Sequence, residues 1–256
     1  MRLLAAAALA LLAITPARAA DDAAFVAWAQ ANARPLSLCP DIAAPSPLDA
    51  VGETIGEARV VALGEPGHGA HEPLAFRNCL FRYLVETQGF TAIALETGLG
   101  ESRALYDYAA GGGGDARDAV RRGFTWGFWR FPENVELLEW IRAYNADARH
   151  GRKISIYGID MSGGEASGEW RHARRTLDDS IAFLARAAPS ASERIRAGLA
   201  PLSRRFHAAG YRAMAARDRQ ELRAAIGALT AFFDAHRAVL IAASSQADFD
   251  WARQNA

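Results

Sequence analysis

The chain has 256 residues, of which 51% are hydrophobic and 23% are charged. This length and apolar content allow a sizeable buried core and exclude an intrinsically disordered chain. The formal net charge is zero and no basic tract occurs, so nucleic acid is not an expected partner.

The first 20 residues have the pattern of a secretory signal peptide. A short basic start is followed by an apolar run from Leu3 to Ile14, which is too short to span a bilayer. The run from Ala17 to Ala19 has the small-x-small pattern of a cleavage site. We therefore predict a signal peptide over residues 1–20 and a periplasmic or secreted mature protein, with no membrane attachment after cleavage. A buried N-terminal helix is the alternative.

A turn rich in reactive side chains lies between a predicted strand and a predicted helix. Residues 59–64 form an apolar run that predicts a strand, and a helix is predicted from Pro73 to Thr87. The turn between them, residues 64–72, holds two carboxylates and two imidazoles among glycines and a proline. Arg77 lies on the apolar stripe of the helix, where a guanidinium needs an acidic partner.

Two further strands are predicted, over residues 90–96 and 153–160. The first of them is nearly all apolar, which is typical of a strand covered on both faces. Strand–helix alternation predicts an α/β fold, a mainly parallel sheet with flanking helices followed by a helical region. We place the α/β portion at residues 21–164 and the helical region at residues 165–256, both within one domain.

All three predicted strands end in an acid: Glu65, Glu96 and Asp160. In a parallel sheet these carboxylates meet at one edge, where open α/β folds bind their ligands. A cluster of like charges needs compensation, for which His68 and Arg77 are the candidates. A histidine flanked by carboxylates can deprotonate water, and an arginine can hold a carbonyl oxygen or stabilise developing negative charge.

These residue types favour direct attack by an activated water molecule. His68 is the predicted base, Glu65 and Glu96 orient it or the water, and Arg77 binds the carbonyl oxygen. No G-x-S-x-G elbow occurs and neither cysteine lies in such a turn, so a covalent serine or cysteine mechanism is not indicated. No cofactor is expected.

A dense aromatic segment, residues 124–131, follows the second predicted strand. We predict that Trp126, Phe128 and Trp129 form one wall of an apolar substrate cleft and that Asp160 also binds substrate. Packing in a core or lid is the alternative for the aromatic residues, and capping of the next segment is the alternative for Asp160.

A metal site is the rival interpretation of the turn. The possible ligands are the imidazoles and carboxylates His68, His71, Glu65, Glu72 and Asp160. Zinc or manganese would suit them, but their spacing does not match H-E-x-x-H and Arg77 would repel a cation. We therefore predict no metal, and an ordinary exposed position in the first helical turn for His71 and Glu72.

The chain contains two cysteines, Cys39 and Cys79. An exported protein could join them in a disulfide. A single pair gives no disulfide framework, and Cys79 lies within a helical pattern, so two unpaired or buried thiols are an equal alternative.

Several short motifs together resemble one known family. They are Leu63 to Gly69, Phe76-Arg77, Leu80 to Leu84, Gly89 to Ala92, Ala94 to Glu96, Ile141 to Asn145 and Tyr157 to Asp160. In this combination, the chain resembles the erythromycin esterase family over roughly residues 25–256. The resemblance implies hydrolysis of a macrolide lactone by activated water without a covalent intermediate, an activity tied to antibiotic resistance. It implies His68 as the general base, with Glu65, Arg77 and Glu96 as further active-site residues and a small-molecule ester as partner.

One expected motif is missing from this sequence. Members of the family usually continue with further strands and a second histidine motif, His-Asn-x-His. The remaining histidines here are isolated: His150, His172, His207 and His236. The resemblance therefore implies the N-terminal portion of the family fold, with part of an active site. The alternative functions are a non-catalytic periplasmic binding protein and a metal-dependent hydrolase.

Overall fold

The structure is a computed structural model that describes residues 22–34, 36–39, 41–43, 45–65, 67–160, 171–203 and 208–256. The predicted signal peptide, residues 1–20, lies outside these ranges. Contacts divide the chain into residues up to Ser37, whose helix is α1 (Asp22–Asn32), and a compact unit from Leu38 to Ala256. None of the helices in the described ranges combines the length and hydropathy needed to span a bilayer.

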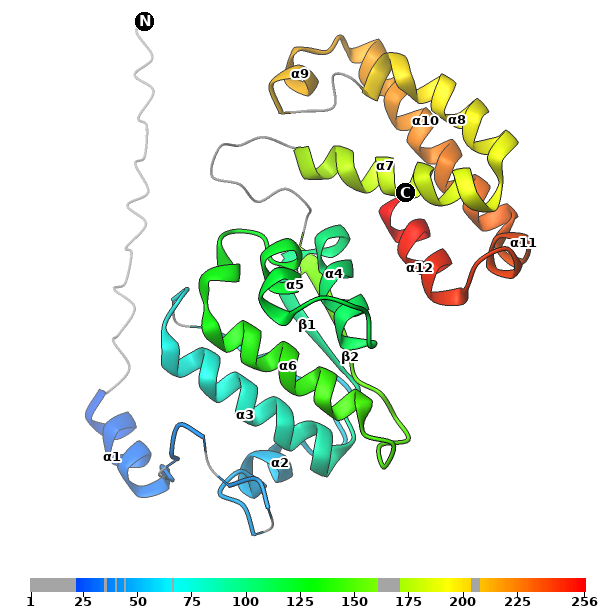
Figure 1. The fold of residues 1–256 in the computed structure, drawn as a ribbon. Coiled ribbons are helices and arrows are strands. Elements are labelled where there is room, and N and C mark those ends of the chain that lie inside the picture. Colours follow the sequence, from blue (N-terminus) through cyan, green and yellow to red (C-terminus); the bar gives the residue numbers. More distant parts are fainter. Residues whose placement is uncertain are drawn as a thin grey trace, which may run out of the picture. The chain divides into compact units, whose positions relative to one another are not determined.

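The larger unit begins with an α/β portion (Figure 1). Its elements in chain order are α2 (Asp49–Ile55), α3 (His71–Gln88), β1 (Ala92–Gly98), α4 (Leu99–Ala109), α5 (Ala116–Gly123), the short 3-10 helix η1 (Phe128–Arg130), α6 (Pro132–Ala146) and β2 (Ser155–Asp160). The described residues after β2 contain six helices: α7 (Arg171–Ala187), α8 (Pro189–Ser203), α9 (Ala208–Ala213), α10 (Ala216–Ala235), α11 (Arg237–Ala242) and α12 (Gln246–Asn255). The predicted α/β fold with parallel strands, flanking helices and a helical region is therefore confirmed.

Strands β1 and β2 pair in parallel, with Ile93 opposite Ile156. The backbone of β2 at position 158 lies very close to the backbone of β1 at Thr97 and Gly98, so only glycine fits there. A Cβ atom there would lie 2.4 Å from the carbonyl oxygen of Thr97. The Gly158 backbone N–H also donates to the Ser102 hydroxyl of α4 at 2.7 Å. The end of the sheet that carries Glu96 and Asp160 is thereby fixed against α4.

The strand predicted over residues 59–64 is wrong. In the described part of the chain the sheet has two strands, β1 and β2, and residues 59–64 are irregular. Val60 is 84% exposed, unlike a residue of a covered strand. The segment borders a cavity next to β1 and makes no ladder with it, so its backbone lacks the hydrogen bonds that define a strand.

The expectation that residues 90–96 form a strand covered on both faces is also wrong. Burial alternates along β1, with Ile93 and Leu95 buried and the residues between them exposed. On β2, Ile159 is 72% exposed. The helices of this portion therefore cover one face of the sheet, and apolar composition alone did not reveal the open face.

One hydrophobic core supports the sheet from α3 and α6, which lie side by side (Figure 1). Its central members are fully or almost fully buried: Phe81, Ile93, Leu137, Ile141 and Ile156. The buried positions of α3 recur at helical spacing, as its apolar stripe predicts. This packing fixes the two helices whose first turns carry the polar residues described below.

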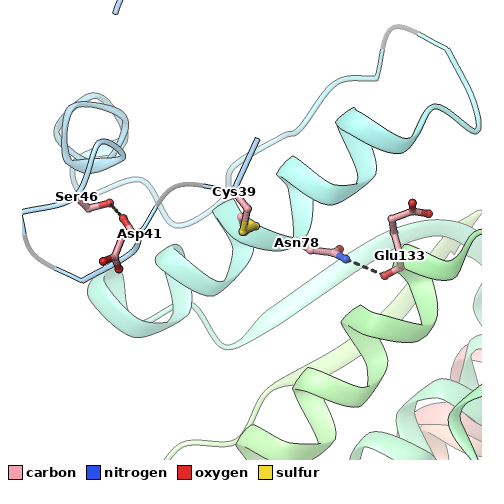
Figure 2. Close-up of a disulfide and its surroundings, with 6 residues drawn as sticks. Cys39, Asp41, Ser46, Asn78 and Glu133 are labelled. Atoms are coloured by element: carbon pink, nitrogen blue, oxygen red, sulfur yellow. Dashed lines mark hydrogen bonds between the residues drawn. A yellow bond between two sulfur atoms is a disulfide. The ribbon is translucent and has the colours of Figure 1, made fainter. Parts of the chain in front are cut away.

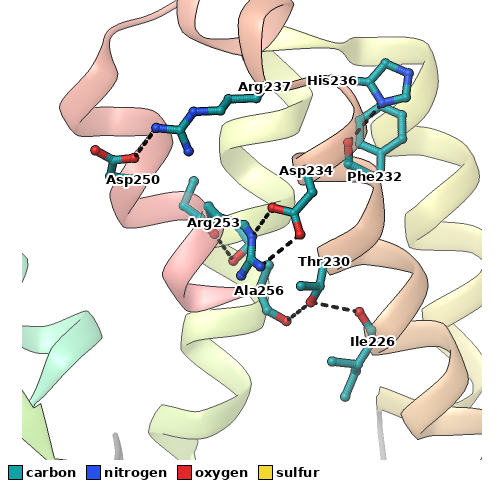
Figure 3. Close-up of polar contacts among 11 residues, drawn as sticks. Ile226, Thr230, Phe232, Asp234, His236, Arg237, Asp250, Arg253 and Ala256 are labelled. Carbon is teal, nitrogen blue, oxygen red and sulfur yellow. Dashed lines mark hydrogen bonds and ion pairs between the residues drawn. The ribbon is translucent and has the colours of Figure 1, made fainter.

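A second core lies among α7, α8, α10 and α12, with Leu184, Leu229 and Phe249 at its centre. Polar contacts also connect α10 and α12, as Figure 3 shows. Arg253 of α12 pairs with both carboxylate oxygens of Asp234 on α10, at 2.7 and 3.0 Å. Arg103 of α4 reaches Asp248 of α12 at 2.7 Å and so connects the helical region with the α/β portion.

The two cysteines form a disulfide, Cys39–Cys79, with 5.5 Å between their Cα atoms (Figure 2). The sequence did not decide between this disulfide and two unpaired or buried thiols. The bond fastens the segment before α2 to the middle of α3. Nearby, the Ser46 hydroxyl donates to the Asp41 carbonyl at 2.6 Å and orders the turn that leads into α2. The irregular N-terminal part of the unit is thus anchored to α3.

Candidate active site

Glu65 and His68 lie together in the turn before α3, which we call the His68 turn (residues 64–70). His68 Nδ1 is 3.2 Å from Glu65 Oε2, and the His68 side chain is 60% exposed. Gly69 makes the turn possible, because its φ of +83° is unfavourable for other residues. A carboxylate at Nδ1 favours the tautomer in which Nε2 carries the lone pair. In that tautomer, Nε2 of the largely exposed His68 ring is able to accept a proton.

Glu96 of β1 joins this pair from the sheet. One ligand-capable atom each from Glu65, His68 and Glu96 lies within 4.8 Å of the others. Asp160, at the end of β2, is not a member of this group in the described part of the chain. Its carboxylate instead accepts a hydrogen bond from Trp126 Nε1 at 2.9 Å. Three of the predicted site residues thus converge, and Asp160 lies with the aromatic segment.

Arg77 lies one turn and a half into α3 and is partly buried beside this group. Its Nη2 donates to Asn78 Oδ1 and to Asn134 Oδ1, both at 2.9 Å. Burial lowers the pKa of Arg77 to about 10, while the nearby carboxylates of Glu65 and Glu133 oppose that shift. Arg77 therefore stays charged at neutral pH. Its hydrogen bonds go to side-chain amides, whereas the sequence analysis expected an acidic partner.

The first turn of α6 supplies residues that the sequence analysis missed. Glu133 Oε1 lies 2.5 Å from His71 Nδ1, and only 5% of the Glu133 side chain is exposed. The Glu133 backbone carbonyl accepts a hydrogen bond from Asn78 Nδ2 at 2.8 Å (Figure 2). Asn134 Nδ2 donates to the carbonyl of Phe128 at 2.9 Å. The only signal in the sequence was two polar residues directly after Pro132, at a helix start.

The aromatic segment contributes unequally to the site. The Phe128 ring lies 5.1 Å from the His68 ring, centre to centre. Phe128 and Phe131 both line the cavity beside His68. Trp126 and Trp129 are exposed, and neither borders that cavity. Of the three aromatic residues predicted to bind substrate, Phe128 is the one that lies against the His68 ring.

Two threonines fasten the aromatic segment to the sheet. The Thr97 hydroxyl accepts from the Thr125 backbone N–H at 2.8 Å and donates to the Gly123 carbonyl at 3.0 Å. The Thr125 hydroxyl accepts from the Gly98 N–H at 3.1 Å. Both side chains are buried. The wall formed by the aromatic segment is therefore held at a fixed position relative to Glu96.

A cavity of about 710 Å³ opens beside these residues. Its polar end is formed by Glu65, His68, Arg77, Glu96 and Asn134, and most of its other lining residues are apolar. The charged end can bind and activate water beside an ester carbonyl, and the apolar lining suits a hydrophobic ligand.

The same group has the composition of a possible metal site. An imidazole and two carboxylates, from His68, Glu65 and Glu96, could hold a divalent cation. Within the ranges that the structure describes, His71, Glu72 and Asp160 do not belong to this group. Arg77, which is charged at neutral pH, lies close enough to Glu65 to interact with its charge, and it would repel a cation.

With this geometry established, comparison with known proteins decides the family. The sequence model of the family described as erythromycin esterase matches residues 85–256. The chain belongs to the erythromycin esterase family. The match begins after the His68 turn, so the assignment is independent of Glu65, His68 and Arg77.

A curated relative supports the same family. Erythromycin esterase type II of Escherichia coli is 38% identical over 108 residues, which are 42% of this chain and 24% of that protein. The matched region is therefore only about a quarter of the relative's length.

Solved structures share the fold. A Bacillus cereus protein aligns with a TM-score of 0.72 at 22% identity, covering 93% of this chain and 55% of that protein. A mutant of the erythromycin esterase EreC in its open conformation aligns with a TM-score of 0.52 at 21% identity, covering 81% of this chain and 50% of that one. The chain thus spans about half the length of these solved structures.

Proposed function

We propose that the protein is a carboxylic ester hydrolase in which His68 activates water for direct attack on an ester carbonyl. The observation that carries this proposal is the contact of Glu65 with His68 Nδ1 at 3.2 Å, with Glu96 in the same group. That contact leaves Nε2 as the ring nitrogen for proton transfer. Membership of the erythromycin esterase family supports the same reaction type.

The proposed reaction proceeds without a covalent intermediate. His68 Nε2 takes a proton from water as the water oxygen bonds to the carbonyl carbon. The carbonyl oxygen becomes an oxyanion, which Arg77 stabilises through its guanidinium. The intermediate then collapses, the bond from carbon to the alcohol oxygen breaks, and the imidazolium returns its proton to the leaving alkoxide. The products are a carboxylic acid and an alcohol.

We propose a hydrophobic ester, including a macrolactone, as the substrate. The apolar lining of the cavity and the Phe128 ring beside His68 support this class. The name of the E. coli relative points in the same direction. We further propose a periplasmic or secreted location, because the pairing of Cys39 with Cys79 requires an oxidising compartment to form and persist.

The test is hydrolysis by wild type, His68→Asn and a matched control, His236→Asn. The control changes an exposed histidine whose ring packs on Phe232 at the end of α10. The substrates are p-nitrophenyl esters of increasing chain length and a 14-membered macrolactone, followed by mass spectrometry in oxygen-labelled water. We expect one labelled oxygen in the acid product, and a loss of roughly 10²–10⁴-fold in His68→Asn alone.

Two outcomes would contradict the proposal. One is wild-type turnover in folded His68→Asn, and the other is no hydrolysis of any ester by folded wild-type protein. Binding of the macrolactone without product would instead support the alternative of a non-catalytic binding protein.

A second candidate, metal-dependent hydrolysis, is favoured by the close grouping of Glu65, His68 and Glu96. It predicts that dialysis against a chelator abolishes turnover and that zinc or manganese restores it. The metal-free proposal predicts unchanged turnover after the same treatment, because the base is the imidazole itself.

A further inference from the structure

Two buried asparagines hold the guanidinium of Arg77. Only 3% of Asn78 and 2% of Asn134 is exposed to solvent. Asn78 Oδ1 accepts a hydrogen bond from Arg77 Nε at 3.2 Å and another from Nη2 at 2.9 Å. Asn134 Oδ1 accepts a second hydrogen bond from Nη2, also at 2.9 Å. Every N–H on Nε and Nη2 is thereby used, and the N–H groups on Nη1 remain.

Nη1 is the part of Arg77 that is left for a ligand. Among the described residues, no group accepts a hydrogen bond from Nη1. Nη1 is also not one of the buried side-chain atoms that lack a partner, so this nitrogen is open to solvent. Arg77 lines the same cavity as His68. A ligand oxygen that binds Arg77 therefore has to approach Nη1.

The orientation of each asparagine amide is fixed by a backbone carbonyl. Asn78 Nδ2 donates to the carbonyl of Glu133 at 2.8 Å, and Asn134 Nδ2 donates to the carbonyl of Phe128 at 2.9 Å. A guanidinium only donates and a carbonyl only accepts, so a flipped amide would lose both of its hydrogen bonds. Arg77 therefore cannot turn without breaking several buried hydrogen bonds.

The groups that hold Arg77 carry no charge. Within the described ranges, the hydrogen bonds of its guanidinium go to amide oxygens. Glu65 and Glu133 favour its charged form through their own charge, without occupying its N–H groups. A carboxylate in the place of either amide would cancel much of the positive charge. Neutral acceptors fix the direction of the guanidinium and leave its charge available to a developing oxyanion.

Asn134 also connects Arg77 with the residues around His68. The carbonyl that Asn134 binds belongs to Phe128, whose ring lies 5.1 Å from the His68 ring, centre to centre. Asn134 lies in the first turn of α6, which is packed on α3 by the hydrophobic core. One amide thus determines where Arg77 lies relative to the aromatic wall beside His68.

We propose that Asn78 and Asn134 are positioning residues that present Nη1 of Arg77 to an anionic oxygen of the bound ligand. In hydrolysis this atom is the former carbonyl oxygen of the ester. That part of the inference rests on the proposed function, whereas the support of Arg77 by two neutral amides does not. Neither asparagine is assigned a contact with the substrate, and both act through Arg77.

The test combines steady-state kinetics on p-nitrophenyl butyrate with calorimetric binding of a stable phosphonate monoester that carries two butyl groups. The tetrahedral anionic phosphonate resembles the intermediate of ester hydrolysis, and its binding requires no turnover. Asn134→Leu removes both hydrogen bonds at similar volume. Asn134→Asp keeps an acceptor for Nη2 and adds a negative charge.

The matched control is Asn145→Leu. Asn145 is an asparagine of the same helix that does not border the cavity. Its amide bonds to the backbone of Ala109 and Ile154. Its replacement therefore costs comparable buried hydrogen bonds without touching Arg77. Urea unfolding verifies that each variant is folded before it is assayed.

We expect Asn134→Leu to lower kcat by about 10–10²-fold with KM changed by less than about twofold, because only the oxyanion loses its contact. Phosphonate binding should weaken by the same factor. Asn134→Asp should lose at least as much, because its charge opposes that of Arg77. Asn145→Leu should be less stable in urea, with unchanged kcat and unchanged phosphonate binding.

Several outcomes would overturn the inference. Equal losses in Asn134→Leu and Asn145→Leu would reveal a purely structural role, and tighter phosphonate binding by Asn134→Asp would exclude the need for a neutral acceptor. An active wild type that does not bind the phosphonate would contradict this inference and spare the proposed function. A wild type that hydrolyses no ester, yet binds the phosphonate in a manner that Asn134→Leu weakens, would do the reverse. If Asn134→Leu does not fold, Asn134→Ser takes its place in the same measurements.

Discussion

His71 Nδ1 lies 2.5 Å from Glu133 Oε1, and this contact joins the start of α3 to the start of α6 across 62 residues of sequence. The partners differ in environment, because Glu133 is buried whereas His71 is largely exposed. His71 directly follows the His68 turn, so the contact fixes one end of that turn to α6. A residue that the sequence assigned to an ordinary exposed position therefore has a structural partner.

This contact predicts a stability that depends on pH. The hydrogen bond to Glu133 raises the pKa of His71 above its ordinary value of 6.5. With a raised pKa in the folded state, the contribution is fully present below about pH 6.5 and is lost as the pH rises through the raised value. We expect His71→Asn to lower the free energy of unfolding at about pH 6 and to have little effect at about pH 9.

Urea unfolding across this pH range measures the effect. The control is His236→Asn, because the His236 ring contacts the backbone carbonyl of Phe232 and no carboxylate. Adding Glu133→Gln to His71→Asn should not increase the difference between the effects on the free energy of unfolding at about pH 6 and at about pH 9. If His71→Asn lowered the free energy of unfolding equally at about pH 6 and about pH 9, the prediction would be contradicted.

Arg77 is predicted to act in turnover through both its charge and its shape. With a pKa of about 10 it is charged at neutral pH, and its fork contacts the amides of Asn78 and Asn134. Arg77→Met should lower kcat by roughly 10²–10³-fold. Arg77→Lys should restore kcat only in part, because the lysine ammonium cannot reproduce the hydrogen bonds of the planar guanidinium to both Asn78 and Asn134.

Steady-state kinetics with a p-nitrophenyl ester measures this effect, and Arg117→Met is the control at an exposed position of α5. Full activity of folded Arg77→Met would exclude the proposed role at the oxyanion.

The His68 turn should tolerate alanine at one glycine and not at another. At Gly69 φ is +83°, and an added Cβ would lie 2.8 Å from the Phe131 ring. At Gly67 an added Cβ would meet no atom within 4 Å. We expect Gly69→Ala to reduce the free energy of unfolding by about 1–3 kcal/mol and to reduce ester turnover. Gly67→Ala should do neither, and similar behaviour of the two variants in urea unfolding and kinetics would refute this reasoning.

The disulfide should contribute measurably to stability. Cys39 and Cys79 are 40 residues apart, so the bond restricts a long loop in the unfolded chain. Cys39→Ser/Cys79→Ala should lower the free energy of unfolding by about 2–4 kcal/mol. Reductant should cause a comparable loss in wild type and none in the double variant. Equal urea midpoints for wild type with and without reductant would speak against a stabilising bond.

Elements with a strong local pattern could be predicted from the sequence. The helix containing Arg77 and the strands around Ile93 and Ile156 carry apolar residues at the spacing of their secondary structure, and they form within a few residues of the predicted bounds. The convergence of Glu65, His68 and Glu96 followed from the turn and from the position of Glu96 on its strand.

Features that depend on distant partners could not be predicted. Residues 59–64 are as apolar as a strand, but a strand also needs a hydrogen-bonded neighbour, which a single segment does not specify. Glu133 and Asn134 follow a proline like many residues of a first helical turn, and only the packing of α6 on α3 brings them to Arg77 and His71.

The double link between Thr97 and Thr125 limits how this molecule can move during a reaction cycle. Because the hydroxyl of each residue bonds to backbone groups of the other's segment, the loop that carries Phe128 cannot swing away without breaking several buried hydrogen bonds at once. In the proposed hydrolysis, we therefore expect substrate to enter and product to leave on the opposite side, at the exposed stretch that ends in Glu65. Mobility measured there should control the turnover rate, whereas the aromatic wall should stay rigid throughout.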